Sequence, residues 1–281
     1  MAAHKTIIVT DSSADLSREE IEANEITIVA LHIHVDGEVV DDCPDLRCKS
    51  FHERMSTAKS KPRVSAPTVA EFIEVYRELA QGNVEIVSIH MSSELGQTYQ
   101  NAVKAKASLA GRHQITVIDS RMISTALGDL VIEAAKASQK GHSAAQITQL
   151  VRGLIPHTYF AFYVNDYEQP LYSEFMPAKY RSVSDASGNR PVMLIEEGEV
   201  VPLQLQRNRG DQYERLADFV SEFGSLKRID VLSSGTYPLP SEFTEQLASH
   251  FPRNIIREEV YGPVMGCLAG SEALCIVARD K

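Results

Sequence analysis

The sequence has no tryptophan, only four cysteines among 281 residues, and no apolar run that approaches the length of a membrane span. A spanning helix needs about 20 predominantly apolar residues, so stable membrane insertion is excluded. The first residues, MAAHKTIIVTDSS, contain no hydrophobic region of signal-peptide length. Few cysteines in a chain of this size are typical of reduced thiols, so a cytoplasmic protein is expected.

Positively charged residues are fewer than negatively charged ones. The chain has 28 Lys and Arg against 38 Asp and Glu, which gives a net charge of −10. Nucleic-acid binding needs clustered cations that neutralise phosphates, so no nucleic-acid partner is expected. The same balance disfavours adhesion to anionic lipid surfaces.

Nucleotide-binding motifs are absent too. Neither the string G-x-x-x-x-G-K-[ST] nor a glycine-rich dinucleotide fingerprint occurs. The sequence therefore predicts no nucleotide cofactor, and no other cofactor is indicated.

The first half of the chain repeats a unit of apolar strand, polar turn and amphipathic helix. Strands are predicted at residues 6–10, 84–89 and 115–119, and capping boxes such as Ser17 with Glu20 start the helices. Apolar strands that alternate with helices predict a parallel sheet covered on both faces. Residues 1–157 are accordingly assigned to one α/β domain.

The second half has a different pattern. A hairpin is predicted at residues 191–206, and single helices alternate with further strands after it. This mixture predicts a second, α+β domain over residues 158–281, with an antiparallel or mixed sheet.

Hydroxyl-rich turns follow three predicted parallel strands: TDSS at 10–13, HMSS at 90–93 and IDSR at 118–121. Ligands of open parallel sheets bind beyond the carboxyl ends of the strands, so the turns should share one binding edge. The segment VSAPT at 64–68 starts a helix and is expected at the same edge. Hydroxyls and helix N-terminal amides suit an anion, here a carboxylate or another small acid.

Other interpretations of the same residues stay open. One alternative is that the hydroxyls are helix caps, which is the ordinary role of Ser and Thr at such positions. An enzyme would use Asp11 or Asp119 beside Ser12 or Ser93, but no histidine stands in a triad pattern, and His90 is interpreted as structural.

A zinc site could be built from Cys43, Cys48 and His52, with His32 and His34 on one strand face. No second ligand pair has the usual spacing, and no metal is predicted.

Five segments in order resemble the DegV family: IVTDSSADL, SAPTVAEF, HMSSELGQTYQNA, VIDSRMIS and GPVMGCLAG. The resemblance runs from Ile8 to Val277. It implies a two-domain α/β protein with a long-chain fatty acid in an apolar tunnel between the domains. It also implies a carrier that has no catalysis of its own and presents the carboxylate to a separate ATP-dependent fatty acid kinase. The alternative is a divergent small-acid or anion-binding α/β enzyme or binding protein that has lost this site.

The resemblance also implies the site residues. Ser65 stands at the family's Ser-x-Pro turn, and Gly96 stands where the family has its second carboxylate-binding serine. Ser93 and Thr98 of the same turn are the further carboxylate candidates. Leu268 replaces the family's histidine and, with Ser12 and Ser120, is assigned to the pocket edge.

Three further departures from the family pattern are visible. Gln97 and Glu272 stand at glycine positions, and Phe175 stands at an arginine position. The pair Arg207 and Arg209 lies where the family has a basic run, and a partner-docking role for it is the alternative to a solvated surface.

Overall fold

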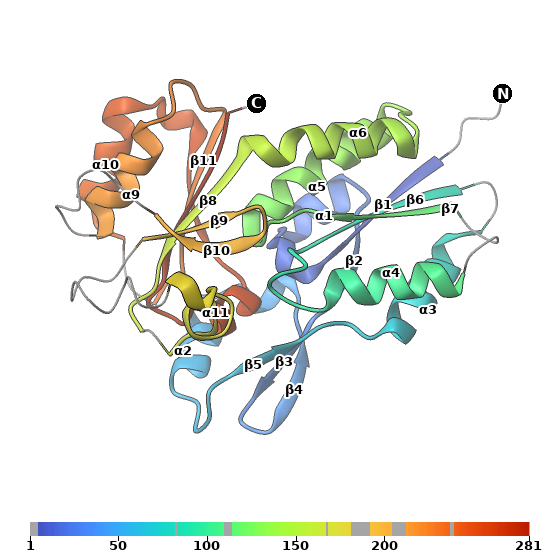
Figure 1. Cartoon of the computed structure of the whole chain (residues 1–281), viewed down its shortest axis with the longest axis horizontal. Helices are drawn as coiled ribbons and strands as arrows, with labels where there is room; N and C mark the ends of the chain where they lie inside the picture. The colour runs from blue at the N-terminus through green and yellow to red at the C-terminus, as the bar shows by residue number, and fades with distance from the viewer. Residues whose placement is uncertain are drawn as a thin grey trace.

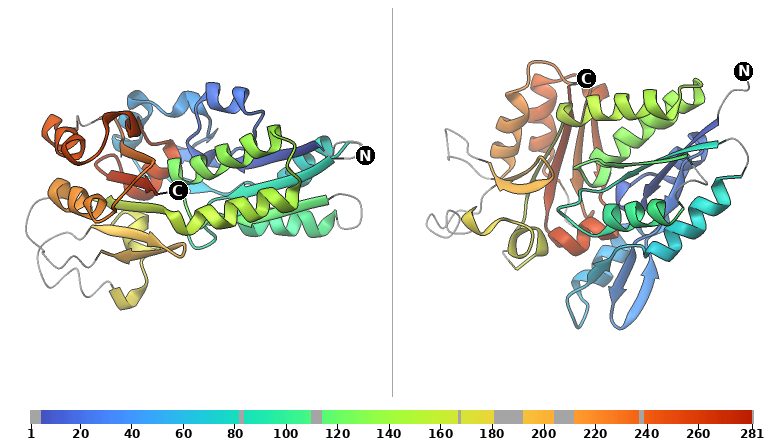
Figure 2. Two further views of the ribbon diagram at one scale, coloured as in Figure 1. Left: turned by 90° about the horizontal axis from the view of Figure 1, so that it is seen from above. Right: turned by 45° about the vertical axis from the view of Figure 1, so that its right-hand side comes forward.

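The computed structural model describes residues 5–81, 84–109, 114–166, 168–180, 192–203, 212–236 and 239–280. Two large sheets lie side by side, with helices packed around them (Figure 1). Figure 2 shows the same arrangement from two further sides, with the N-terminal part in blue to green and the C-terminal part in yellow to red. In these described residues, no helix is long and apolar enough to cross a membrane.

The N-terminal sheet is parallel throughout, as the alternating pattern predicts. Its strand order is β2-β1-β6-β7, so every strand ends at the same edge. The strands are β1 (Lys5–Asp11), β2 (Thr27–Val29), β6 (Val84–His90) and β7 (Gln114–Asp119).

Helices cover both faces of this sheet. Helices α3 and α4 pack on the face that presents Ile7 and Val9, and α5 and α6 pack on the face that presents Ile8. The predicted capping box at Ser17 is confirmed, and Thr68 and Ser143 form two more. The helices are α1 (Arg18–Ala23), α3 (Val69–Leu79), α4 (Thr98–Ser108), α5 (Ser124–Gln139) and α6 (Ala144–Leu154), and the short 3-10 turns are η1 (Ser12–Ala14) and η3 (Ile155–His157).

A small antiparallel sheet, which the sequence pattern does not predict as a separate unit, projects from the N-terminal part (Figure 1). Its order is β4-β3-β5, and the turn at Asp36 and Gly37 has φ of 51° and 81°. The strands are β3 (His32–Val35), β4 (Glu38–Asp41) and β5 (Arg63–Ser65). Between β4 and β5 the chain forms η2 (Pro44–Leu46) and α2 (Lys49–Ser56).

The C-terminal sheet is mixed, as predicted, with the order β10-β9-β8-β13-β11-β12 and one parallel pair, β11 with β12. The strands are β8 (Thr158–Tyr163), β9 (Met193–Glu196), β10 (Glu199–Pro202), β11 (Arg228–Ser233), β12 (Ile256–Val260) and β13 (Leu274–Arg279). The helical segments are α7 (Pro170–Ser173), α9 (Gln212–Ser221), α10 (Ser241–His250), η4 (Arg253–Ile255) and α11 (Pro263–Ala269).

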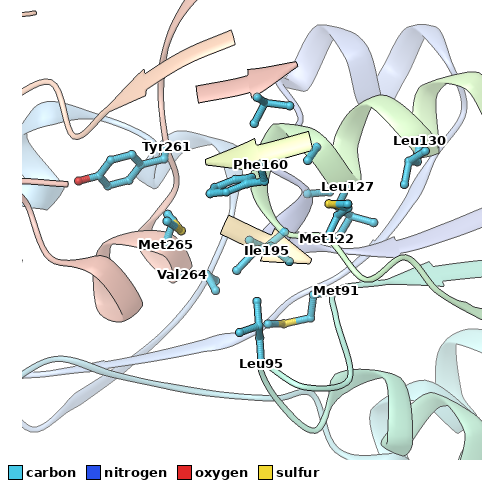
Figure 3. Packing of buried hydrophobic residues seen from close by; sticks show 14 of the residues in the cluster. Met91, Leu95, Met122, Leu127, Leu130, Phe160, Ile195, Tyr261, Val264 and Met265 are labelled. Carbon is cyan, nitrogen blue, oxygen red and sulfur yellow. The ribbon is translucent and has the colours of Figure 1, made fainter. Parts of the chain in front are cut away.

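One hydrophobic core runs through both parts of the chain. Its members include Met91 and Leu95 from the turn after β6, together with Phe160, Ile195 and Met265 from the C-terminal part (Figure 3). Six of the seven methionines belong to this core, and Met1 lies outside the described residues. The other two hydrophobic clusters contain no described methionine. Methionine is unbranched and adapts its shape, so this core can repack more easily than the other two.

Candidate functional site

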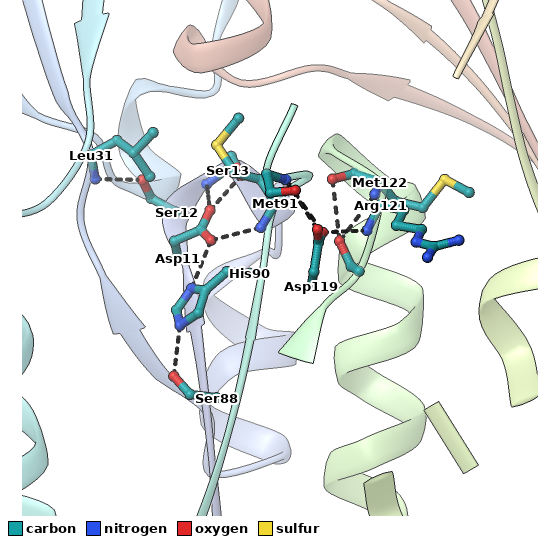
Figure 4. Close-up of polar contacts among 12 residues, drawn as sticks. Asp11, Ser12, Ser13, Leu31, Ser88, His90, Met91, Asp119, Arg121 and Met122 are labelled. Atoms are coloured by element: carbon teal, nitrogen blue, oxygen red, sulfur yellow. Dashed lines mark hydrogen bonds and ion pairs between the residues drawn. The ribbon is translucent and has the colours of Figure 1, made fainter. Parts of the chain in front are cut away.

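The three hydroxyl-rich turns meet at the carboxyl edge of the parallel sheet (Figure 4). The amide of Met91 donates to Asp11 Oδ2 across 3.0 Å, and the amide of Ser93 donates to Asp119 Oδ1 across 3.3 Å. The amide of Ser120 donates to the carbonyl of His90 across 3.0 Å. The convergence expected from the parallel topology is therefore present in the structure.

Most hydroxyls at this edge already bind the protein itself. Ser12 Oγ accepts from the amide of Leu31 at 3.0 Å. Ser120 Oγ accepts from the amide of Met122 at 3.1 Å, and Ser92 Oγ donates to the carbonyl of Gly198 at 2.9 Å. Ser12 and Ser120 thus brace the loops behind the edge, which matches the capping interpretation of such residues.

A buried chain of hydrogen bonds joins β1, β6 and α3. Tyr76 donates its hydroxyl to Ser88 at 2.9 Å, Ser88 Oγ lies 2.6 Å from His90 Nε2, and His90 Nδ1 lies 2.9 Å from Asp11 Oδ2. The order Asp–His–Ser is that of a hydrolase triad. Here Asp11, Ser88 and His90 are all 0 % exposed, so no substrate reaches Ser88 and the chain of bonds ties the elements together. Burial also raises the pKa of Tyr76, which keeps its hydroxyl a donor.

A second buried cluster joins the start of the chain to β12. The guanidinium of Arg47 donates to the carbonyls of Asp15 and Val260 and pairs with Glu259 at 2.9 Å. Burial raises the pKa of Asp15, although Arg47 opposes the shift. Burial likewise raises the pKa of Asp42 well above its usual range. Arg47 thus links the N-terminal part, at Asp15, to Val260 and Glu259 of β12.

The start of α4, like those of α2 and α5, has no side-chain cap. Where α1, α3 and α6 have complete capping boxes, the N-cap residue of α4, Gln97, makes no side-chain cap. The next residue, Thr98, is 0 % exposed, and its hydroxyl has no hydrogen-bond partner among the described residues. A buried hydroxyl without a partner costs about 1–3 kcal/mol. This helix start therefore offers uncapped amides and an unused buried donor.

Gly96 and Ser93 lie in the same turn and are both half-buried. A side chain at Gly96 would have room, because an added Cβ would lie 3.6 Å from Met91 Cε, its nearest neighbour. The turn thus stands between the uncapped helix and the shared core.

Ser65 ends β5 and lies close to α4, as the side chain of Asn101 donates to the carbonyl of Pro67 at 2.8 Å. The hydroxyl of Ser65 is 2.8 Å from His34 Nε2. Leu268 is buried in α11, a helix that packs against β5 and β3. The segment of Ser65 therefore lies beside the first turns of α4 on one side and contacts α11 on the other.

His34 and Asn101 were not predicted as neighbours of the site, because cross-strand register and helix docking bring them there. The other metal candidates do not gather. His52 binds the carbonyl of Tyr261 at 2.7 Å inside the core, while Cys43 is exposed. Among the described residues, no three His, Cys, Asp or Glu side chains are grouped as metal ligands. Arg207 and Arg209 lie outside the described residues.

A cavity of about 910 Å³ lies where the two parts of the chain meet. Its wall includes Asp119 at the polar edge, Tyr99 of α4, and the core residues Met122, Phe160 and Ile195. The cavity therefore reaches Met122, Phe160 and Ile195 of the shared core from the turn that contains Asp119. A smaller cavity of about 330 Å³ adjoins α11 and is lined by polar residues that include Asn165 and Glu272.

Comparison with known proteins yields consistent matches. The model of the DegV family matches residues 5–281. A DegV domain-containing protein of Staphylococcus aureus strain N315 is 27% identical over 281 residues, which cover 99% of each chain. A fatty acid binding DegV family protein from Streptococcus agalactiae has a TM-score of 0.86 at 20% identity, over 99% of this chain and 100% of its own. DegV from Bacillus subtilis, described as a fatty acid binding protein, has a TM-score of 0.85 at 22% identity with the same coverage. These structures share the fold of this chain.

Proposed function

This chain belongs to the DegV family, and on that premise we propose that it binds a long-chain fatty acid between its N-terminal part, residues 1–157, and its C-terminal part, residues 158–281. The carboxylate lies at the start of α4, near Ser65, Ser93, Gly96 and Thr98. The acyl chain runs into the core shared by both parts.

The observation that carries this proposal is the unused polar capacity at the start of α4. Its amides have no side-chain cap, and the buried hydroxyl of Thr98 has no partner among the described residues. A carboxylate would accept from both and would be favoured by the helix dipole, by about 0.3–1 kcal/mol. Helix α5 also starts without a side-chain cap and has an unpartnered hydroxyl at Thr125. That hydroxyl lies beside Asp15, whereas the first turns of α4 lie beside the segment of Ser65.

The shared core supports the apolar half of the proposal. Each buried methylene contributes roughly 0.8 kcal/mol, so a long chain supplies most of the affinity. Methionine side chains can move aside to admit such a chain. Met91, Met122 and Met265 lie along the junction of the two parts (Figure 3), where the acyl chain would run.

We further propose that the chain is a carrier rather than an enzyme and that a separate ATP-dependent kinase phosphorylates the bound carboxylate in the cytoplasm. The sequence has no phosphate-binding loop of its own. Ser65, Ser93 and Gly96 are only half-buried, which leaves the carboxylate end accessible to a partner. The four cysteines are free thiols, in keeping with a reducing compartment.

Gly96→Ser tests where the carboxylate lies. The added hydroxyl fits beside Met91 and should donate to the carboxylate, which would tighten palmitate binding about fivefold, the value of an ordinary hydrogen bond. Titration calorimetry measures the change. The matched control is Gly224→Ser, at an exposed glycine with open space around it, and it should leave the affinity unchanged. Unchanged or weaker binding by Gly96→Ser would contradict the proposed position.

A further inference from the structure

His34 lies against Ser65 on the outward face of the small sheet. Its Nε2 is 2.8 Å from Ser65 Oγ, and its side chain is exposed. The antiparallel register pairs His34 with Arg63 and His32 with Ser65. Because His32 is paired with Ser65, and His34 lies two residues from His32 on the same strand, His34 and Ser65 lie on one face of the sheet as diagonal neighbours.

The other histidine of this face, His32, is already paired with two carboxylates. His32 Nδ1 is 2.7 Å from Asp41, and its Nε2 is 3.1 Å from Glu71. His34 forms no ion pair with a carboxylate anywhere in the described ranges. The two histidines are therefore not equivalent, and only His34 has its charge available for a ligand at Ser65.

The charged groups on the elements around His34 leave this face open to an anion. Arg63 on β5 is exposed beside it. The acids are held by other partners: Asp41 by His32, Glu38 by Arg54, Glu71 by His32 and Thr68, and Asp36 by the amide of Lys59. Glu94, in the turn before α4, is exposed to solvent.

We propose that His34 and Ser65 together form the part of the site that recognises the acid group; this inference rests on the proposed function. In the neutral ring with an unprotonated Nε2, the Ser65 hydroxyl donates its proton to His34. In the protonated ring, Nε2–H donates to Ser65 Oγ instead, so the hydroxyl proton is free to bind a carboxylate oxygen. Protonation thus adds a positive charge and converts Ser65 into a donor toward the ligand.

The consequence is pH-dependent binding, because histidine is the side chain that changes charge between pH 5 and 8. The affinity for palmitate should be about tenfold higher at pH 6 than at pH 8, the effect of a hydrogen bond to a charged group. Hexadecanol, which has the same chain length and no charge, should bind equally at both pH values.

The test compares wild type, His34→Gln and His142→Gln by fluorescence displacement with palmitate and hexadecanol at pH 6 and pH 8. His142 is an exposed histidine near the opposite end of β1, where its carbonyl accepts from Thr6, so its variant should behave like wild type. His34→Gln should lose the gain at pH 6 and keep hexadecanol binding, which also shows that the site is folded.

Two results overturn the inference, and they are distinguishable. If His34→Gln binds palmitate with the same pH dependence as wild type, His34 does not recognise the acid group. The proposed function is then unaffected. Failure of wild type to bind palmitate at either pH would remove the proposed function and this inference together.

Discussion

Thr98→Val is expected to make the ligand-free protein more stable and, at the same time, to weaken its binding of palmitate. The Thr98 hydroxyl is fully buried and has no hydrogen-bond partner within the described residues. Removing such a hydroxyl relieves a desolvation cost, so the free energy of unfolding should rise by about 1 kcal/mol or more. Loss of a donor to a charged ligand should weaken palmitate binding about 10- to 100-fold.

Thr125→Val is the matched control for this experiment. Thr125 is the second residue of α5, it is buried, and its hydroxyl also has no described partner. It lies beside Asp15 and Gly128, away from α4. Thr125→Val should stabilise the protein similarly and leave palmitate binding as in wild type. Denaturant unfolding and titration calorimetry supply the two readouts. A Thr98→Val variant that binds palmitate as tightly as wild type would contradict the assigned site.

Gly128→Ala is expected to destabilise the protein, although alanine is the better helix former. In an open helix the change would be favourable by about 0.8–1 kcal/mol. At Gly128 the new methyl group would overlap the carbonyl oxygen of Ala14 and lie 3.1 Å from Leu16 Cδ2. A backbone carbonyl cannot rotate aside as a side chain can, so α5 must shift away from η1. Such overpacking costs about 1–3 kcal/mol, which outweighs the gain in helix propensity.

Gly153→Ala provides the comparison. Gly153 lies in α6, is exposed and has no atom near the position of an added Cβ. Its substitution should raise the unfolding midpoint in urea, whereas Gly128→Ala should lower it. If both variants were stabilised, the close packing of α5 against η1 described above would be wrong.

The fold of the N-terminal part could be predicted because its signals are local. Apolar strands such as Thr6–Thr10 and capping boxes such as Ser17 with Glu20 each encode one element within a few residues. Parallel topology then brings the strand ends to one edge. That reasoning also predicted the convergence of the turns at Asp11, His90 and Asp119.

Other features depend on contacts between distant segments, which a single sequence does not display. Helix α11 was not predicted, because all seven of its residues are buried and a short, wholly apolar run looks the same in a helix and in a strand. The strand β5 is only three residues long and forms through pairing with β3. The contact of His34 with Ser65 follows from that pairing.

The sequence indicates which hydroxyls stand at the proposed site, but not what each of them binds. Hydroxyls were expected to line a binding edge, but Ser12 and Ser120 bind backbone groups instead. The proposed site rests instead on the buried hydroxyl of Thr98, which, like those of Thr10 and Thr125, has no hydrogen-bond partner in the described chain. Whether a hydroxyl is satisfied depends on the packed structure, so residue type alone could not single out Thr98.

Native mass spectrometry of the chain, purified without detergent from bacterial cells, tests the central claim most directly. The account predicts a mass increase that corresponds to one long-chain fatty acid, which denaturation releases and lipid analysis identifies as a free carboxylic acid. Delipidated protein incubated with palmitate should regain one equivalent. A chain that carries no acyl ligand after purification and takes up none from palmitate would contradict the account.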